Sequence, residues 1–167
     1  MKNRNKAGAH IRKRPMRKKD KEITDIKEIE RIIKKATCCR IGLVDNDEPY
    51  VVPVSFGYER NALYFHGALE GRKVELIKKN NQVCFEIDAD VEVVKSKKPC
   101  SWTMKYRSVI GIGRAYILES DEEKSHGLRL IMGQYAGGDF SFPKSTLDRT
   151  LVVKVDIKSI TGKQSGY

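Results

Sequence analysis

Runs rich in β-branched and aromatic residues dominate the chain and predict a series of strands. Within the run 106–119, Gly111 and Gly113 stand two residues apart and therefore on one face, where a neighbouring backbone or a ligand comes close. The acidic stretch Asp-Asn-Asp-Glu-Pro joins the first two runs as a hairpin. The predicted strands lie at residues 38–44, 50–58, 63–66, 83–89, 106–119 and 150–157, and residues 91–94 either extend the fourth or follow it separately.

Three segments have the spacing of amphipathic helices instead. The first is capped by Thr24 and runs to about Lys35, and the second begins near Glu70 and ends at Asn80-Asn81. The third opens with a capping box formed by Ser120 and Glu123, and the glycines at 137 and 138 stop it. The expected buried stripes are Ile26, Ile29, Ile33 and Ala36 in the first helix, and Leu128, Ile131, Met132 and Tyr135 in the third.

The order of these elements predicts a mainly β (α+β) domain over residues 20–163. Most successive strands are joined by hairpins or short turns, which favours an antiparallel, Greek-key-like β-barrel with helices packed outside it. A doubly wound sheet would need a helix between nearly every pair of strands. No G-x-G-x-x-G segment leads from a strand into a helix, which also disfavours that alternative.

Positive charge is concentrated at the start of the chain. The net charge is +11, but residues 1–19 hold nine Lys or Arg and no acid, which leaves 24 basic and 22 acidic residues in the remainder. We expect this segment to be a disordered tail that either remains solvated or contacts nucleic acid or an acidic membrane weakly. No apolar run is long enough for a membrane span, and no apolar stretch typical of a secretion signal follows the first basic residues.

The four cysteines, Cys38, Cys39, Cys84 and Cys100, form no C-x-x-C pair, and the three histidines are scattered. A zinc site is therefore not expected. With no secretion signal, the expectation is a cytoplasmic protein with reduced thiols. Motifs for a nucleophile elbow and a P-loop are also missing, which gives hydrolytic or P-loop chemistry little support.

The most informative stretch is 63–73, a short strand, a turn with Gly67 and Gly71, and a helix start that carries Arg72 and Lys73. A helix N-terminus has unpaired N–H groups and partial positive charge, so two cations beside it favour a phosphate. A solvated basic helix start is the alternative. His66 ends the strand beside this turn and is either structural or a ligand contact.

Several separated motifs resemble the nitroimidazole-resistance (Nim) proteins of the pyridoxamine 5′-phosphate oxidase-like, flavin-binding split-barrel superfamily. The resemblance covers about residues 16–163. The motifs are Met16-Arg-Lys-Lys-Asp-Lys-Glu-Ile23, Pro53-Val-Ser-Phe-Gly-Tyr58, Tyr64-Phe-His-Gly-Ala68, Gly71-Arg-Lys73, Cys100-Ser-Trp-Thr-Met104 and Tyr106-Arg-Ser-Val-Ile-Gly111.

The resemblance implies a split barrel that forms a homodimer and binds two FMN molecules at the subunit interface. It implies that a strand flanks the flavin ring, that the next strand contacts the ring, and that a basic pair binds the phosphate. It also implies that segments of the partner subunit reach the site. The corresponding residues are Val52, Pro53, Val54 and Ser55, then Phe65 and His66, then Arg72 and Lys73, and for the partner segments Trp102, Tyr106, Arg107 and Ser108.

By the same resemblance we expect an oxidoreductase that reduces small nitroaromatic or related acceptors, with NAD(P)H or another donor supplying electrons. His66 is the candidate catalytic residue, because imidazole can position or protonate a substrate near neutral pH. A flavin carrier or sensor without turnover is the alternative from another class. Haem and the deazaflavin F420 are alternative ligands within the superfamily.

Overall fold

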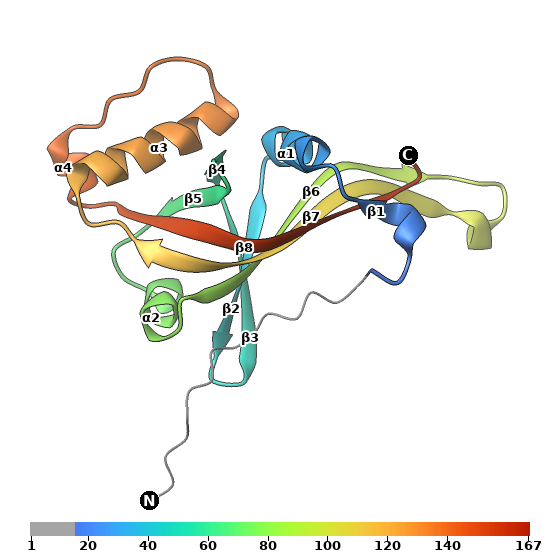
Figure 1. The fold of residues 1–167 in the computed structure, drawn as a ribbon, viewed down its shortest axis with the longest axis horizontal. Helices are drawn as coiled ribbons and strands as arrows, with labels where there is room; N and C mark the ends of the chain where they lie inside the picture. Colours follow the sequence, from blue (N-terminus) through green and yellow to red (C-terminus); the bar gives the residue numbers. More distant parts are fainter. Residues whose placement is uncertain (1–15) are drawn as a thin grey trace, which may run out of the picture.

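The computed structural model describes residues 16–167 and contains one large sheet with helices at its ends and sides (Figure 1). The predicted tail, residues 1–19, falls mostly outside the described residues; its last residue begins a 3-10 turn, Lys19–Lys21. The strands are β1 (Glu22–Ile23), β2 (Cys39–Asp45), β3 (Glu48–Val54), β4 (Phe56–Glu59), β5 (Ala62–Gly67), β6 (Gln82–Val94), β7 (Thr103–Ile117) and β8 (Leu151–Ser165). The helices are α1 (Ile26–Lys35), α2 (Arg72–Lys79), α3 (Asp121–Tyr135) and α4 (Lys144–Leu147).

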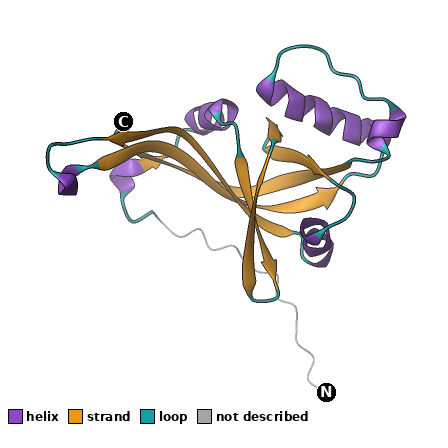
Figure 2. Ribbon diagram, turned by 180° about the vertical axis from the view of Figure 1, so that it is seen from behind, coloured by secondary structure: helices purple, strands orange, loops and turns teal. Residues whose placement is uncertain are grey.

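A single residue closes the sheet into a split barrel. The strands lie in the order β3-β2-β6-β7-β8-β5-β4, β1 pairs with β8, and every pairing is antiparallel. β3 and β4 stand at opposite ends of this order, yet only Ser55 separates them in the chain. Because one residue spans roughly 3.3 Å, the end of β3 lies next to the start of β4, and the sheet curls round (Figure 2). The predicted antiparallel split barrel with peripheral helices is confirmed.

The main hydrophobic core fills the barrel and continues under α1 and α2. Phe56, Phe65 and Phe85 are its largest fully buried side chains. A Cβ at Gly111 would collide with the Phe85 ring, and one at Gly113 would lie 2.7 Å from the carbonyl oxygen of Asp156. These two glycines therefore make room for a side chain and a neighbouring strand rather than for a ligand.

A second buried cluster lies beneath α3 and joins this helix to β5 and β8. α3 approaches β4 closely at Gly57, where a Cβ would lie 2.6 Å from the carbonyl oxygen of Leu130. The amide of Gln134 donates to the backbone carbonyls of Ile33 (2.9 Å) and Ala36 (2.8 Å), so α3 caps the C-terminus of α1. The capping box holds as predicted, with the Glu123 N–H donating to the Ser120 hydroxyl.

The predicted buried stripes are partly wrong. Ile26 is 50% exposed, and Ile32 takes its place in the core with Ile29 and Ile33. Asp25, not Thr24, caps this helix by accepting from the Lys27 N–H. Tyr135 is 42% exposed, because its hydroxyl is tied to backbone groups at the edge of the barrel.

Strand lengths also differ from the prediction. The run 50–58 breaks at Ser55 where the chain changes edges, and 83–94 forms one strand, β6, whose register shifts between Ala89 and Glu92. β8 reaches Ser165, well beyond 157, because its second half pairs with both β7 and β1. The short elements β1 and α4 carry too few residues for a pattern to reveal them.

None of the helices within residues 16–167 is long and apolar enough to cross a bilayer. Over the same residues, no group of three His, Cys, Asp or Glu side chains lies close enough to hold a metal ion, and the four thiols are free.

Candidate functional site

The turn between β5 and α2 brings together a strand end and an open helix start. Gly71 adopts φ +123°, which disfavours any residue with a Cβ, and it stands at the N-cap of α2 without a side-chain capping bond. The helix begins at Arg72, two residues later than predicted. Its first N–H groups therefore face outward without a capping side chain and favour an anion.

Lys73 points back from α2 over the end of β5. Its ammonium lies 5.3 Å from the centre of the Phe65 ring, and a Cβ at Gly67 would come within 3.2 Å of it. Within residues 16–167 no carboxylate approaches this ammonium closely enough to form an ion pair. Burial lowers the pKa of Lys73, because the charged form loses part of its hydration. An anion bound here would restore that lost stabilisation.

Arg72 turns the opposite way and is already neutralised. Its guanidinium lies 3.0 Å from the Asp45 carboxylate and stacks 4.7 Å from the centre of the Tyr50 ring, both on the β2–β3 hairpin. The two adjacent cations therefore do not converge on one point. Sequence reasoning missed Asp45 and Tyr50, because nothing local to the chain signals a contact across 27 residues.

His66 and Phe65 occupy opposite faces of β5. Phe65 is completely buried in the barrel core, and neither its ring nor its backbone is exposed in the single chain. His66 is exposed at the end of the strand. Burial of part of the ring, followed by the nearby Lys73 charge, lowers the pKa of His66. The neutral imidazole is therefore favoured at pH 7, and it can both donate and accept a hydrogen bond.

Residues 52–55 form the end of an edge strand and the crossing to β4. Val52 and Val54 point toward the core, whereas Pro53 and Ser55 are exposed. β3 pairs only with β2, which leaves its other edge without a partner strand within residues 16–167. Pro53 is compatible with such an edge because it lacks an N–H. The unpaired edge can offer backbone donors and acceptors to a planar ligand.

The remaining predicted residues lie at the other end of the molecule, on the β6–β7 arm (Figure 1). Along β8, Ser108 pairs with Lys163 and His66 pairs with Val152, so the two positions are separated by roughly 35 Å of strand. Trp102 is 49% exposed near the arm tip, and its indole donates to the Ser96 carbonyl. One chain does not bring these residues to His66.

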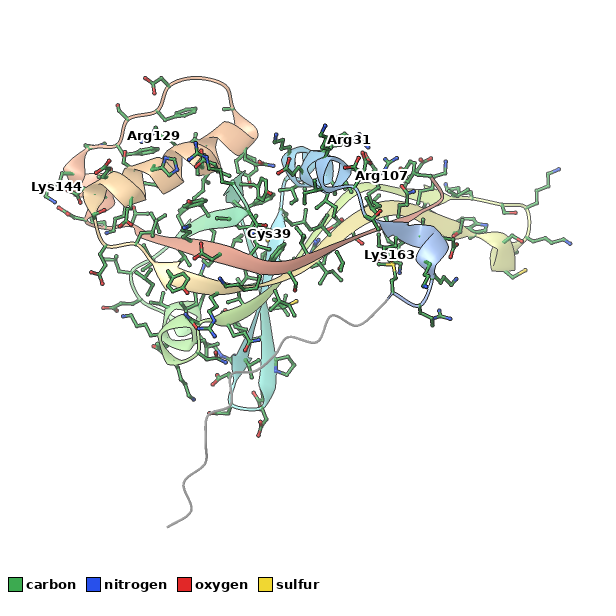
Figure 3. All side chains as sticks on the ribbon, in the orientation of Figure 1. Arg31, Cys39, Arg107, Arg129, Lys144 and Lys163 are labelled. Atoms are coloured by element: carbon green, nitrogen blue, oxygen red, sulfur yellow. The ribbon has the colours of Figure 1, made fainter. Side chains whose placement is uncertain are left out.

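Arg107 belongs to a network of its own beside α1 (Figure 3). Its guanidinium lies 2.6 Å from Asp90 and 3.6 Å from Glu28, and the Tyr167 ring stacks on it at 3.9 Å. Hydrogen bonds from Lys35 and Arg107 lower the pKa of Asp90. Arg107 is only 18% exposed and holds the arm to α1. Tyr106 and Ser108, on either side of it, are half-buried.

Comparisons with known proteins agree on the fold. A solved candidate 5-nitroimidazole antibiotic resistance protein from Bacteroides thetaiotaomicron is 37% identical, with a TM-score of 0.77 and 86% of each chain covered. The flavocytochrome Anf3 from Azotobacter vinelandii is 20% identical (TM-score 0.80, covering 95% of this chain and 75% of that one). A FAD- and haem-binding protein from Mycobacterium smegmatis is 18% identical (TM-score 0.78, covering 88% and 74%).

A search of curated proteins found no match. A family model described as pyridoxamine 5′-phosphate oxidase matches residues 25–164. The match begins just before α1 and ends one residue before the end of β8. Both this match and the 37% identical structure agree with the motifs that resemble the nitroimidazole-resistance proteins. The chain belongs to the pyridoxamine 5′-phosphate oxidase family.

Proposed function

We propose that the protein binds FMN and uses it to reduce small nitroaromatic or related acceptors. The observation that carries this proposal is the pairing of the Lys73 ammonium, which has no ion-pair partner within residues 16–167, with the uncapped start of α2. A phosphate monoester carries up to two negative charges and suits both features. The unpaired edge of β3 then offers backbone groups to the edge of the flavin ring.

The related proteins support a flavin as the ligand. The 37% identical protein is described as a candidate nitroimidazole resistance protein, and a more distant neighbour binds FAD and haem. The Lys73 ammonium and the uncapped start of α2, together called the Lys73 corner, suit a phosphate group. They favour FMN over haem, because haem carries carboxylates and no phosphate.

A homodimer completes the proposed site. His66 and Lys73 lie at one end of the chain, and Trp102, Tyr106 and Ser108 lie at the other, so one copy supplies the phosphate corner and its partner supplies the arm. The outer face of β3, β2, β6 and β7 favours this association, because it holds an apolar groove of about 430 Å³. Val51 is 62% exposed on it and Ile110 is 49% exposed nearby.

In the proposed reaction, the cofactor and the protein have different roles. FMN supplies the electron transfer, and the protein has to bind it, orient it and exclude competing reactions. Lys73 holds the phosphate, and the β3 edge orients the ring. His66 is neutral near pH 7, so its ring N–H can donate a hydrogen bond that positions the acceptor, and its other ring nitrogen can take up a proton.

The test starts with the purified full-length protein, its absorbance spectrum and the mass of the ligand released on denaturation. A flavin spectrum and the mass of FMN support the proposal, while a Soret band or the mass of the deazaflavin contradicts it. Turnover of a nitroimidazole with NADH or NADPH then separates a reductase from a carrier or sensor. Tight FMN binding without turnover by any donor would favour the carrier.

A further inference from the structure

A second cavity, separate from the Lys73 corner, lies where α3 crosses β5 and β8. Its volume is about 280 Å³. Tyr64 forms its floor from β5 and Lys154 flanks it from β8. The α3 residues that line it are Glu122, Glu123, His126 and Arg129. Arg129 is labelled on this helix in Figure 3. The strand residues are neighbours, because Tyr64 pairs with Lys154 across β5 and β8.

The Tyr64 ring is buried, and its hydroxyl opens onto the cavity. Only 7% of this residue is exposed, and its ring packs edge-on to His126 with centroids 5.9 Å apart. Within residues 16–167 its hydroxyl takes part in no hydrogen bond, although it borders the cavity. Among residues 16–167, Arg107 Nε is the one buried side-chain donor or acceptor without a partner, so solvent reaches the Tyr64 hydroxyl through the cavity. The hydroxyl is therefore free to bond a polar ligand there.

The charges around the hydroxyl have both signs. Arg129 donates to Ser125 but has no carboxylate within 4.0 Å among the described residues, and the Glu122 carboxylate has no cation within that distance. Lys154 is held 2.9 Å from Asp156 and keeps donors for a further acceptor. The Nε2 atom of His126 already contacts the Glu59 carboxylate at 3.1 Å. A simple anion would meet Glu122, and a simple cation would meet Arg129 and Lys154.

We propose that this cavity binds a small zwitterion of the α-amino acid class. The ligand carboxylate accepts from the Tyr64 hydroxyl, Lys154 and Arg129, and its ammonium faces Glu122. The size agrees, because the cavity lies below the roughly 300–1,000 Å³ typical of drug-sized ligands. A flavin nucleotide therefore does not fit, and the proposal stands independently of the flavin site.

The test titrates glycine, L-alanine and L-glutamine into the full-length protein and follows the amide NMR signals of residues 118–129 and the His126 ring signal. N-acetyl-L-alanine and L-alaninamide, each lacking one charge, and acetate serve as ligand controls. We expect at least one of the three amino acids to give saturable shifts, and all three controls to bind more than about tenfold more weakly.

Two variants locate the binding. Tyr64→Phe removes only a hydroxyl without a partner, so the fold is retained, and we expect about 3- to 10-fold weaker binding. Arg129→Gln is expected to weaken binding about 10-fold or more. Tyr116→Phe, a change at an exposed tyrosine on the neighbouring strand, should leave binding unchanged.

Three outcomes would overturn the proposal. They are the absence of saturable shifts from all three amino acids up to about 100 mM, acetate binding as tightly as an amino acid, and unchanged binding in a folded Tyr64→Phe protein. Urea unfolding of each variant confirms that it is folded before its affinity is compared.

Discussion

The hydroxyl of Tyr135 lies 2.9 Å from the backbone nitrogen of Phe56 and accepts its hydrogen bond. The same hydroxyl donates to the carbonyl oxygen of Thr37, 3.1 Å away. Phe56 begins β4 and Thr37 precedes β2, so one side chain from α3 joins the two sides of the barrel where they meet. This bond satisfies an N–H on the edge strand next to Ser55.

Replacing Tyr135 by Phe should destabilise the protein, because the Phe56 N–H and the Thr37 carbonyl both lose their partner. We expect a loss of about 1–3 kcal/mol in the free energy of unfolding, measured by urea denaturation. Tyr116→Phe is the matched control, since the Tyr116 hydroxyl makes no hydrogen bond within residues 16–167. Equal stability of the two variants would show that the Tyr135 bridge contributes nothing.

Gly57 should tolerate no larger residue. A Cβ there would press on the backbone of Leu130 and Ile131, so Gly57→Ala is expected to cost about 1–3 kcal/mol of stability. Gly133, on α3, has open space around it, and Gly133→Ala is expected to stabilise the helix by up to about 1 kcal/mol. Opposite shifts in the urea midpoints of the two variants are the expected result, and shifts of the same sign would contradict it.

The two adjacent cations of α2 should differ in their contribution to cofactor binding. Lys73→Gln removes a cation without a carboxylate partner in the described chain, so FMN affinity is expected to fall roughly 10- to 100-fold. Arg72→Gln should have a smaller effect, because Asp45 already neutralises that guanidinium.

Riboflavin, which lacks the phosphate, is the control ligand. Fluorescence titration should show that its affinity hardly changes in the Lys73→Gln protein. A similar loss for both ligands would place Lys73 away from the phosphate.

The pKa of His66 should lie below the ordinary value of 6.5 in the folded, ligand-free protein, first because of burial and then because of Lys73. An unfolded chain therefore binds a proton at His66 before the folded one does. The neutral His66 ring therefore contributes fully to the free energy of unfolding above pH 6.5. This contribution falls as the pH drops from 6.5 toward the pKa of the folded protein.

NMR titration of the His66 ring signal measures this pKa directly. Lys73→Gln should raise it, yet leave it below 6.5, because burial is the larger cause and remains. A pKa at or above 6.5 in the unliganded protein would be inconsistent with this environment.

Homodimer formation should protect one thiol. Cys84 and Cys100 are both exposed in the single chain, but only Cys84 borders the apolar groove on the outer face. We expect maleimide to modify Cys100 first, with Cys84 protected at concentrations where light scattering shows a dimer.

Val51→Lys, a change at an exposed position of that face, should yield a monomer and expose Cys84. Ile26→Lys, at a similarly exposed position on α1, should do neither. Rapid labelling of Cys84 in the dimer would show that the dimer interface lies on another face of the protein.

Much of the fold could be predicted from local patterns, because each strand and helix of ordinary length has a hydrophobic face of its own. The capping box at Ser120 and the glycine turn before Arg72 are local signals, and both proved reliable. The predictions that were wrong concerned residues whose environment depends on contacts far away in the sequence. Ile26 has the right spacing for the core, but the way α1 packs selects Ile32 instead.

The candidate site shows the same limit. The sequence places Arg72 beside Lys73, but Asp45, 27 residues earlier, turns Arg72 away. The family resemblance assigns Phe65 and His66 to one ligand contact, whereas the pleat of β5 puts Phe65 inside the barrel and His66 outside. A motif identifies which residues gather at a corner, and only the sheet determines which of them face a ligand.

The position of β8 has a consequence for how the protein is made. This strand is the last along the described chain, yet it lies in the middle of the sheet between β7 and β5. Until the ribosome has released it, β5 and β7 each keep an open edge, and the two halves of the barrel have nothing to pair through. Folding must then join segments about 90 residues apart in the chain. Such a topology gives slow folding and a need for protection from aggregation during synthesis.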